Sequence, residues 1–505
     1  MDKPKALIFI VAYNHERFIE AVLDRIPENI WNNERFETEI LIIDDQSNDL
    51  TFSIAKEYAK KNDRLKITVF HNPKNLGYGG NQKIGYQYAI VRGYDVVVLL
   101  HGDGQYAPEH LEQMILPILN KECDVVLGSR MIDKGSALQG KMPLYKWIGN
   151  LILTFIQNRI LGVKLAEFHT GYRAYSVPAL SSIPFAYDSD YFDFDTDILI
   201  QLIDTHKCIK EIPIPTFYGD EISRVRVLKY GLLILSSSLL SRFMKLGIFY
   251  HPKFDYESTN TYYTIKTGYP STHQFAVDRV TQGSTVLDIG CGPGYMAEEL
   301  EKKSTRTISI DRYVGEVAKQ HSFKAIQADV EAFDYESLPS VDTVLMLDII
   351  EHLRSPEKLL QSLRKRYCRE KPEFIISTGN IAFFPIRLML LFGQFNYGKR
   401  GILDLDHTRL FTFKSLRRIL DNYGYEITLE VGQPVPFPLV FGRRRLSSIL
   451  LKINLFFIKL SKSLFSYQMI FVARPKPTME LLLENAQEAG DGSKILPIND
   501  WISSK

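Results

Sequence analysis

Cysteine is scarce in this sequence, and the wide spacing of the cysteines argues against a fold stabilised by disulfides or by zinc. Among 505 residues there are four cysteines, Cys123, Cys208, Cys291 and Cys368. No two of them form a CxxC pair, so we expect neither a disulfide framework nor a cysteine-based zinc site. An excess of charge is also lacking, because 61 Lys and Arg oppose 59 Asp and Glu, a formal net charge of +2. This balance gives no indication of a nucleic-acid partner.

Long apolar runs are lacking as well. No segment has the 18 or more uninterrupted apolar residues of a transmembrane helix, so none is predicted. The N-terminal apolar run continues into a polar motif without a cleavage site, which predicts a first strand, not a signal peptide, and a cytoplasmic protein. Three shorter apolar stretches are Gly231–Leu240, Ile381–Gly393 and Leu446–Phe465.

The third stretch has apolar residues at helical spacing with lysines between them. Such a pattern is typical of a membrane-surface helix and equally of a helix packed on a core. We favour the core interpretation. Peripheral contact with the inner face of a membrane stays open, because Arg443, Arg444 and Arg445 adjoin this stretch.

The length predicts several domains, and 45% hydrophobic with 24% charged residues is typical of a folded globular protein. Apolar strands followed by helices occur in two series, which predicts an α/β fold with a mostly parallel sheet in each half. We expect domains at residues 1–249 and 250–475 and a flexible tail at 476–505. The predicted strands are Ala6–Val11, Glu39–Ile43, Lys66–His71, Val96–Leu100, Val125–Gly128, Thr285–Ile289, Thr307–Ile310, Lys324–Gln327, Thr343–Leu347 and Phe374–Ser377, with Gln468–Arg474 as a closing antiparallel strand.

Glycines and acids mark a donor pocket in the second half. A strand ends at Asp288, and a turn with GxGxG spacing follows, formed by Gly290, Gly292 and Gly294. Glycines permit unusual backbone conformations and close approach of a ligand. Asp311 and Asp329 follow the next two strands, where acids can meet ribose hydroxyls and adenine. An NAD-dependent dehydrogenase, the alternative, would have GxGxxG at the turn.

This pocket resembles that of class I S-adenosylmethionine-dependent methyltransferases, whose first motif is similar to LDIGCGPG at residues 287–294. Their later motif is similar to VDTVLMLDIIEHLRSP at 341–356. The resemblance covers about residues 270–475 and implies a Rossmann-like, seven-stranded fold with S-adenosylmethionine as cofactor. Methyl transfer to a hydroxyl needs a base, and histidine is the usual one near neutral pH. His352 and His407 are therefore candidate catalytic residues, although either histidine could be structural.

Polar residues also follow the strands of the first half. The first strand leads into Ala12, Tyr13 and Glu16, and the second ends at Asp44 and Asp45. In open α/β sheets ligands bind beyond the carboxyl ends of the strands, so these residues predict a nucleotide pocket. Asp44 and Asp45 could alternatively cap the next helix.

The next two motifs suit a diphosphate and its counterion. Gly77 lies in a glycine-rich segment that opens a helix, and a helix N-terminus suits a diphosphate. Asp103 follows the apolar strand VVVLL, where it can hold a divalent cation that neutralises the leaving group.

These ordered motifs resemble glycosyltransferase family 2, in the branch similar to dolichyl-phosphate mannose synthases, over about residues 4–235. The resemblance implies a GT-A-type fold and sugar transfer with inversion from a UDP- or GDP-sugar to a lipid-linked (polyprenyl phosphate) or saccharide acceptor. It implies a nucleobase pocket, a basic residue near the phosphates, an acid near the acceptor and a site for Mg²⁺ or Mn²⁺. The matching residues are Ala12, Tyr13, Glu16 and Asp45 for the base, Arg130 for the phosphates, Asp195 and Asp197 for the acceptor, with Asp197 as the orienting acid, and His101, Asp103 and Gln105 for the metal.

His101 stands where the family has an aspartate, which leaves the metal preference open. A sugar nucleotidyltransferase, the rival for this half, would carry a GxGxR-like loop after the first strand, where this chain has AYNHER. Two donor sites on one chain suggest that one glycan meets both, because tethering raises the effective concentration of product near the second site. The alternatives are methyl transfer to an unrelated small molecule or lipid, and a non-catalytic front domain that binds nucleotide or glycan.

Overall fold

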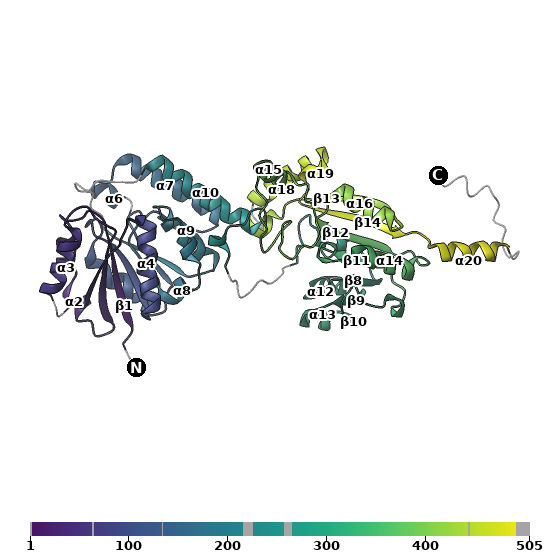
Figure 1. Cartoon of the computed structure of the whole chain (residues 1–505), viewed down its shortest axis with the longest axis horizontal. Coiled ribbons are helices and arrows are strands. Elements are labelled where there is room, and N and C mark those ends of the chain that lie inside the picture. Colours follow the sequence, from purple (N-terminus) through teal and green to yellow (C-terminus); the bar gives the residue numbers. More distant parts are fainter. Residues whose placement is uncertain are drawn as a thin grey trace. The chain divides into compact units, whose positions relative to one another are not determined.

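The computed structural model describes residues 3–62, 65–133, 135–215, 226–256, 265–442 and 445–490. The chain forms two compact units. One contains the residues up to Met244 and a short segment from His251, and the other contains Lys245–Tyr250 and the C-terminal half. Each unit is built on one seven-stranded sheet flanked by helices (Figure 1). The predicted α/β fold with one mostly parallel sheet in each half is confirmed. The boundary expected near residue 250 lies in a stretch where the chain alternates between the units.

The first sheet has the strand order β3-β2-β1-β4-β6-β5-β7. All neighbouring pairs are parallel except those of β6, which is antiparallel to both β4 and β5. The five strands predicted for this half form, whereas β6 and β7 were not predicted. The strands are β1 (Lys5–Ala12), β2 (Glu37–Asp44), β3 (Ile67–His71), β4 (Val96–His101), β5 (Val125–Ser129), β6 (Arg173–Ser176) and β7 (Ile209–Pro213).

Helices cover both faces of this sheet (Figure 1). They are α1 (Ile19–Asp24), α2 (Glu28–Trp31), α3 (Thr51–Lys61), α4 (Gly77–Val91), α5 (Leu111–Leu119), α6 (Ser136–Gln139), α7 (Leu144–Leu161), α8 (Val177–Ser181), α9 (Phe194–Asp204) and α10 (Val227–Lys245), with short 3₁₀ turns at Pro108–His110, Phe185–Tyr187 and Pro252–Phe254.

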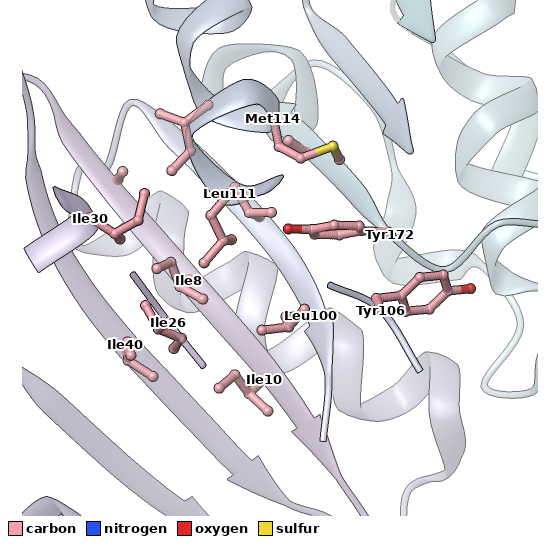
Figure 2. Packing of buried hydrophobic residues seen from close by; sticks show 14 of the residues in the cluster. Ile8, Ile10, Ile26, Ile30, Ile40, Leu100, Tyr106, Leu111, Met114 and Tyr172 are labelled. Atoms are coloured by element: carbon pink, nitrogen blue, oxygen red, sulfur yellow. The ribbon is translucent and has the colours of Figure 1, made fainter. Parts of the chain in front are cut away.

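Strand alternation divides the core of the first unit into two layers. Successive side chains of a strand point to opposite faces of the sheet. Ile8 and Ile10 of β1 therefore pack with Leu111 and Met114 on one face (Figure 2). Phe9 belongs to the cluster on the other face. Because both faces are buried, the carboxyl ends of the strands form the edge where polar side chains can meet a ligand.

The second sheet has the order β10-β9-β8-β11-β12-β14-β13, and β14 runs antiparallel to both β12 and β13. The predicted closing antiparallel strand is thus confirmed, whereas β13 was not predicted. The strands are β8 (Thr285–Ile289), β9 (Arg306–Asp311), β10 (Lys324–Gln327), β11 (Thr343–Leu347), β12 (Glu373–Gly379), β13 (Tyr425–Gln433) and β14 (Gln468–Pro475). The helices are α11 (Thr272–Arg279), α12 (Tyr295–Glu301), α13 (Glu316–His321), α14 (Pro356–Tyr367), α15 (Phe384–Leu391), α16 (Phe413–Asn422), α17 (Phe437–Phe441), α18 (Arg445–Leu460), α19 (Lys462–Phe465) and α20 (Met479–Gly490), with 3₁₀ turns at Tyr335–Ser337 and Ile350–His352.

The apolar stretches and the tail differ from expectation. Among the described residues, α10 is the one helix whose length and composition would allow it to cross a membrane, although none was predicted. The apolar row on α18 is exposed, so the favoured core interpretation is wrong for that face. The expected flexible tail contains α20, where Leu481 is buried and Glu484 forms an ion pair with Arg369. The end of the tail lies outside the described residues.

Candidate active sites

A cleft of about 960 Å³ lies in the first unit, beyond the carboxyl ends of β1, β2 and β4. Its size falls in the range of small-molecule sites, which are about 300–1,000 Å³. Asp44 and Asp197 are not among its lining residues. The predicted site residues that do line it are Ala12, Tyr13, Glu16, Asp45, Gly77, His101, Asp103, Gln105 and Arg130.

The two acids at the end of β2 have structural partners. Asp44 is fully buried, accepts a hydrogen bond from the Ser47 N–H (3.1 Å) and lies 2.7 Å from His71 Nδ1. The carboxylate of Asp45 accepts hydrogen bonds from the backbone N–H groups of Leu76 and Gly77, both at 2.9 Å. Asp45 therefore braces the start of α4 and does not cap the next helix, α3, as the alternative had it. The N–H of Gly77, expected to meet a diphosphate, is already bonded to this carboxylate.

His101 belongs to a hydrogen-bonded chain. The Tyr78 hydroxyl donates to Asp195 Oδ2 at 3.0 Å and lies 3.0 Å from His101 Nε2. Because the hydroxyl proton points to Asp195, the Tyr78 oxygen accepts from His101 Nε2–H, and this nitrogen is not a free metal ligand. Burial lowers the pKa of His101, so the ring is neutral. A Cβ at Gly171 would lie 2.6 Å from the imidazole, which shows how closely the backbone approaches it.

The expected metal ligands are thus not equivalent. Asp103 and Gln105 both line the cleft, and Asp103 Oδ1 accepts the Gln105 N–H at 3.0 Å. In the described part of the chain, no three His, Cys, Asp or Glu side chains are grouped to hold an ion. Mg²⁺ commonly binds through one or two carboxylates together with substrate phosphates. Asp103 and Gln105 fit such a shared site by their oxygen chemistry, and His101 could contribute only its Nδ1, because its Nε2 is bonded to Tyr78.

Arg130 lines the cleft with its charge already paired. Its side-chain Nε–H donates to Glu167 Oε1 at 3.0 Å, and its backbone N–H donates to Glu167 Oε2 at 2.7 Å. Burial alone would raise the pKa of Glu167, but the Arg130 cation and its hydrogen bonds hold that pKa below the usual value. Glu167 and Arg130 therefore form a buried pair that braces the cleft wall, and the pairing reduces the positive charge available to a diphosphate.

Asp197 lies outside the cleft, and Asp195 lines it. The carboxylate of Asp197 is fully buried and forms an ion pair with Lys253, with Nζ at 2.9 and 3.0 Å from its two oxygens. Asp195 accepts from Tyr78 and from Gln82 Nε2 (3.2 Å). The geometry gives no support to a role for Asp197 at the acceptor, and Lys253 could not be paired with it from sequence.

In the second unit, the glycine turn follows β8 as expected. Gly290, Gly292 and Gly294 all have positive φ. A Cβ at Gly294 would lie 2.2 Å from the Ala318 Cα, and one at Gly290 would lie 2.7 Å from Ile349. A Cβ at Gly292 would meet no atom within 4 Å. Two of the glycines are therefore required for packing, whereas Gly292 borders open space that a ligand can occupy.

The acids after β9 and β10 hold the neighbouring loops. Asp311 accepts hydrogen bonds from the N–H groups of Gly292 (2.8 Å) and Tyr313 (2.9 Å). Asp329 forms an ion pair with Arg312 at 2.7 Å. Each carboxylate still has lone pairs for a ribose or adenine, because a carboxylate can accept about four hydrogen bonds.

Two buried acids near the carboxyl ends of β8 and β11 have unpartnered oxygens. Asp288 Oδ2 and Glu351 Oε2 have no hydrogen-bond partner among the described residues. Burial, and secondarily Asp311, raises the pKa of Asp288 to about 7. Burial and Asp348 raise the pKa of Glu351 to about 8. Such unsatisfied, perturbed acids are typical of ligand sites, and a cationic donor with an amino group fits them.

The two candidate histidines lie together. Glu351 O accepts hydrogen bonds from the N–H groups of Thr408 (2.9 Å) and Arg409 (3.0 Å), so the two motifs meet. The rings of His352 and His407 contact edge to face, with centroids 4.8 Å apart. His407 Nδ1 lies 2.9 Å from Ile402 O, and His352 Nδ1 lies 3.2 Å from Asp406 O. Since a carbonyl only accepts, each Nδ1 carries the proton and each Nε2 can act as a base.

Comparison with known families defines both units. Residues 7–183 match the sequence model of glycosyl transferase family 2, and residues 264–430 match that of a methyltransferase domain. The chain therefore carries a glycosyltransferase family 2 domain followed by a methyltransferase domain. Both are domains of enzymes, as the sequence predicted.

Curated relatives match the first unit. One is the UDP-N-acetylglucosamine–dolichyl-phosphate N-acetylglucosaminyltransferase of Methanococcus voltae, 31% identical over 42% of this chain and 86% of that protein. Another is the undecaprenyl-phosphate mannosyltransferase of Micrococcus luteus, 28% identical over 44% of this chain and 87% of that protein.

Solved structures resemble each unit. Glucosyl-3-phosphoglycerate synthase from Mycobacterium tuberculosis, in complex with Mn²⁺, UDP and glucosyl-3-phosphoglycerate, is 16% identical with a TM-score of 0.35, over 47% of this chain and 79% of that chain. A SAM-dependent methyltransferase from Archaeoglobus fulgidus is 19% identical with a TM-score of 0.28, over 40% of this chain and 94% of that chain.

Proposed function

We propose that the first unit transfers a sugar, with inversion, from a UDP- or GDP-sugar to a polyprenyl phosphate. We propose further that the second unit transfers a methyl group from S-adenosylmethionine to the same lipid-linked glycan. The observation that carries the first step is the cleft at the strand ends, where the motif residues of the family gather. The relatives named for dolichyl and undecaprenyl phosphates support the choice of acceptor.

The cleft has groups for both substrates. Tyr13, Glu16 and Asp103 lie on the side formed by the strand ends, where the nucleotide is expected. Lys146 and Leu153 come from α7 and supply positive charge and an apolar wall for a prenyl phosphate. A phosphate acceptor is already anionic, so the attack on the sugar carbon needs no base. Asp195, which lines the cleft, takes the acceptor-positioning role that the sequence gave to Asp197.

A divalent cation bound by Asp103, Gln105 and the donor would neutralise the diphosphate leaving group. His101 contributes by orienting Tyr78 and Asp195 instead of binding that ion. In the second unit, Asp288 and Glu351 supply hydrogen-bond acceptors for S-adenosylmethionine. His407 Nε2 removes the proton of the hydroxyl that receives the methyl group.

A donor screen on the full chain tests this function. UDP- and GDP-sugars are supplied with undecaprenyl phosphate, with and without Mn²⁺, and the extracted lipid is analysed by mass spectrometry before and after addition of S-adenosylmethionine. We expect a glycosylated lipid from one nucleotide class and a further methyl group only on the glycosylated lipid. If the first unit bound neither UDP nor GDP, the glycosyltransferase assignment would fall. If no methyl group were transferred to any saccharide, the proposal that both units act on one glycan would fall.

One observation favours a second candidate, in which the first unit binds nucleotide or glycan without catalysis. His101 replaces the aspartate of the family's metal motif, and its Nε2 is bonded to Tyr78. Mn²⁺-dependent hydrolysis of the donor separates the two functions, because a binding module would leave UDP- and GDP-sugars intact. Asp103→Asn is the matched control, since it should abolish hydrolysis by an active enzyme.

A further inference from the structure

An apolar face lies exposed along α18. Apolar side chains recur every three or four residues on this helix, with exposed fractions from 39% to 65%, at Leu446, Ile449, Ile453, Phe456, Phe457 and Leu460. Ser447, Leu451 and Ile458 are buried on the opposite side. The helix is therefore anchored to the unit by one face and presents a second apolar face outward. An ordinary surface helix would carry polar residues there.

The apolar face continues onto α15. Leu388, Leu390, Leu391 and Phe392 are exposed, Leu391 by 77%. A row of aromatic rings links the two helices, because Phe384 of α15 lies 6.4 Å from Phe465, and Phe465 lies 5.0 Å from Phe457 of α18 (centroid distances). Figure 1 labels α15, α18 and α19 close together in the second unit. We call the exposed apolar residues of α15 and α18 the α15–α18 patch.

The segments that carry this patch contain basic residues and no acidic ones. Residues 380–403 and 431–479 contain no Asp or Glu. Lys452 and Lys459 are exposed on α18. Because they are seven residues apart, about two helical turns, they lie on the same side of the helix. Neither lysine forms an ion pair in the part of the chain that the structure describes. The nearby Glu430 is paired with Arg417 and Lys462. The patch thus combines exposed hydrocarbon with unneutralised positive charge.

We propose that the α15–α18 patch docks on a membrane surface that carries anionic headgroups. Apolar side chains of an interfacial helix enter the boundary between headgroups and acyl chains, while its lysines meet the lipid phosphates. Self-association through the patch is disfavoured, because it would bring the cationic borders of two copies together without an acidic partner. The proposal concerns the second unit and holds whichever acceptor the first unit uses.

The helix α20 provides an internal contrast. It also exposes apolar side chains, at Met479, Leu482 and Leu483. Its sequence, however, contains Glu480, Glu484 and Glu488 and no basic residue. Repulsion from anionic lipid makes α20 unsuitable for the same surface, so it supplies matched control substitutions.

Vesicle flotation of the full chain tests the proposal. Vesicles of phosphatidylcholine alone are compared with vesicles of phosphatidylcholine and phosphatidylglycerol. The double variant I453N/F456N should bind the anionic vesicles at least about tenfold more weakly, because two exposed apolar side chains are lost. The control L482N/L483N should bind as the parent does. K452E/K459E should bind the anionic vesicles at least about thirtyfold more weakly and lose most of the preference for phosphatidylglycerol, because the attraction of two lysines, roughly 1 kcal/mol each, is lost.

Three results would overturn the proposal. One is equal flotation of the parent and I453N/F456N. Another is loss of flotation only when Leu228 and Leu232 of α10 are replaced, which would assign membrane contact to the first unit. The third is a dimer in solution, detected by light scattering, that I453N/F456N dissociates. Unchanged thermal unfolding and S-adenosylhomocysteine binding of the variants show that a loss of flotation is not a loss of folding. Failure of sugar transfer would leave these results unaffected.

Discussion

The carboxyl ends of the two sheets carry acids of the same kind in different states. In the first unit, Asp44 and Asp45 are occupied by donors of the protein itself. In the second, Asp288 and Glu351 each keep a buried oxygen without a partner among the described residues. The hydrogen bonds of an acid at a strand end therefore show how much of its accepting capacity the protein itself uses and how much is left for a ligand.

The loops differ in the same way. Asp45 holds the loop before α4 with a side chain, whereas the loop before α12 is shaped by glycines that allow backbone to approach backbone. A side-chain brace can be weakened by degrees, while a glycine packed against a neighbour tolerates no larger residue. The two sites are thus expected to respond differently to substitution.

The largest effect is expected in the glycine turn. Gly294→Val should destabilise the second unit by about 5 kcal/mol, because strain at positive φ and overlap with Ala318 add together. Gly292→Ala, where the Cβ meets no atom, should cost only about 1 kcal/mol and mainly weaken S-adenosylhomocysteine binding. Chemical unfolding and calorimetric titration measure both variants. Similar destabilisation by the two would contradict the distinction between packing and ligand-facing glycines.

The next effect is a pH dependence of the ligand-free second unit. The folded pKa of Asp288, about 7, lies above the ordinary value of 3.8, so the folded state holds the proton more tightly. The associated stability is complete below about pH 4 and is lost as the pH rises through 7, at most about 4 kcal/mol. Glu351 acts in the same direction. Asp288→Asn should flatten the profile of thermal unfolding against pH; an unchanged profile would refute the assignment.

Methyl transfer should depend more on His407 than on His352. Burial lowers the pKa of His407, which keeps its Nε2 unprotonated and basic near neutral pH. We expect His407→Gln to lower kcat about a hundredfold, near 2.7 kcal/mol, and His352→Gln to lower it about tenfold or less. Rates across pH, with donor affinity as the control, measure this. A larger loss at His352 would reverse the assignment.

The smallest expected effect is a difference in stability between two variants of the first unit, Asp45→Asn and Asp103→Asn. Asp45→Asn removes a charged acceptor from two backbone donors and should destabilise the unit by about 2 kcal/mol. Asp103→Asn should leave stability within about 0.5 kcal/mol and abolish sugar transfer. Thermal unfolding and transfer assays on both variants test the contrast. If Asp103→Asn unfolded the unit while Asp45→Asn did not, the roles would be exchanged.

Much of the fold was predictable because its central strands are apolar throughout. The strand of VVVLL and that of TVLDI formed close to where the sequence placed them, since strands buried on both faces leave a continuous apolar signal. β6 was missed because Arg173, within a four-residue strand, interrupts that signal. β13 was missed because it lies at the sheet edge and alternates with exposed residues such as Glu426.

The candidate sites were predicted in location more than in role. Ala12, Asp103 and Gln105 do line one cleft, because parallel strands bring their carboxyl ends to one edge. Asp197, in contrast, pairs with Lys253, which is 56 residues away in sequence. The outward apolar face of α18 was likewise not predictable, because helical spacing shows that a stripe exists but not which side the protein covers.

The sequence by itself determined two α/β units, the order of their motifs and the edge of each sheet at which these motifs gather. These properties follow from local apolar patterning and turn chemistry, which act within a few residues. Only the tertiary structure decided that Asp45 braces the start of α4, that His101 is bonded to Tyr78, and that one oxygen each of Asp288 and Glu351 has no partner among the described residues. Those outcomes depend on long-range hydrogen bonds and burial, and residues far apart in the chain supply both.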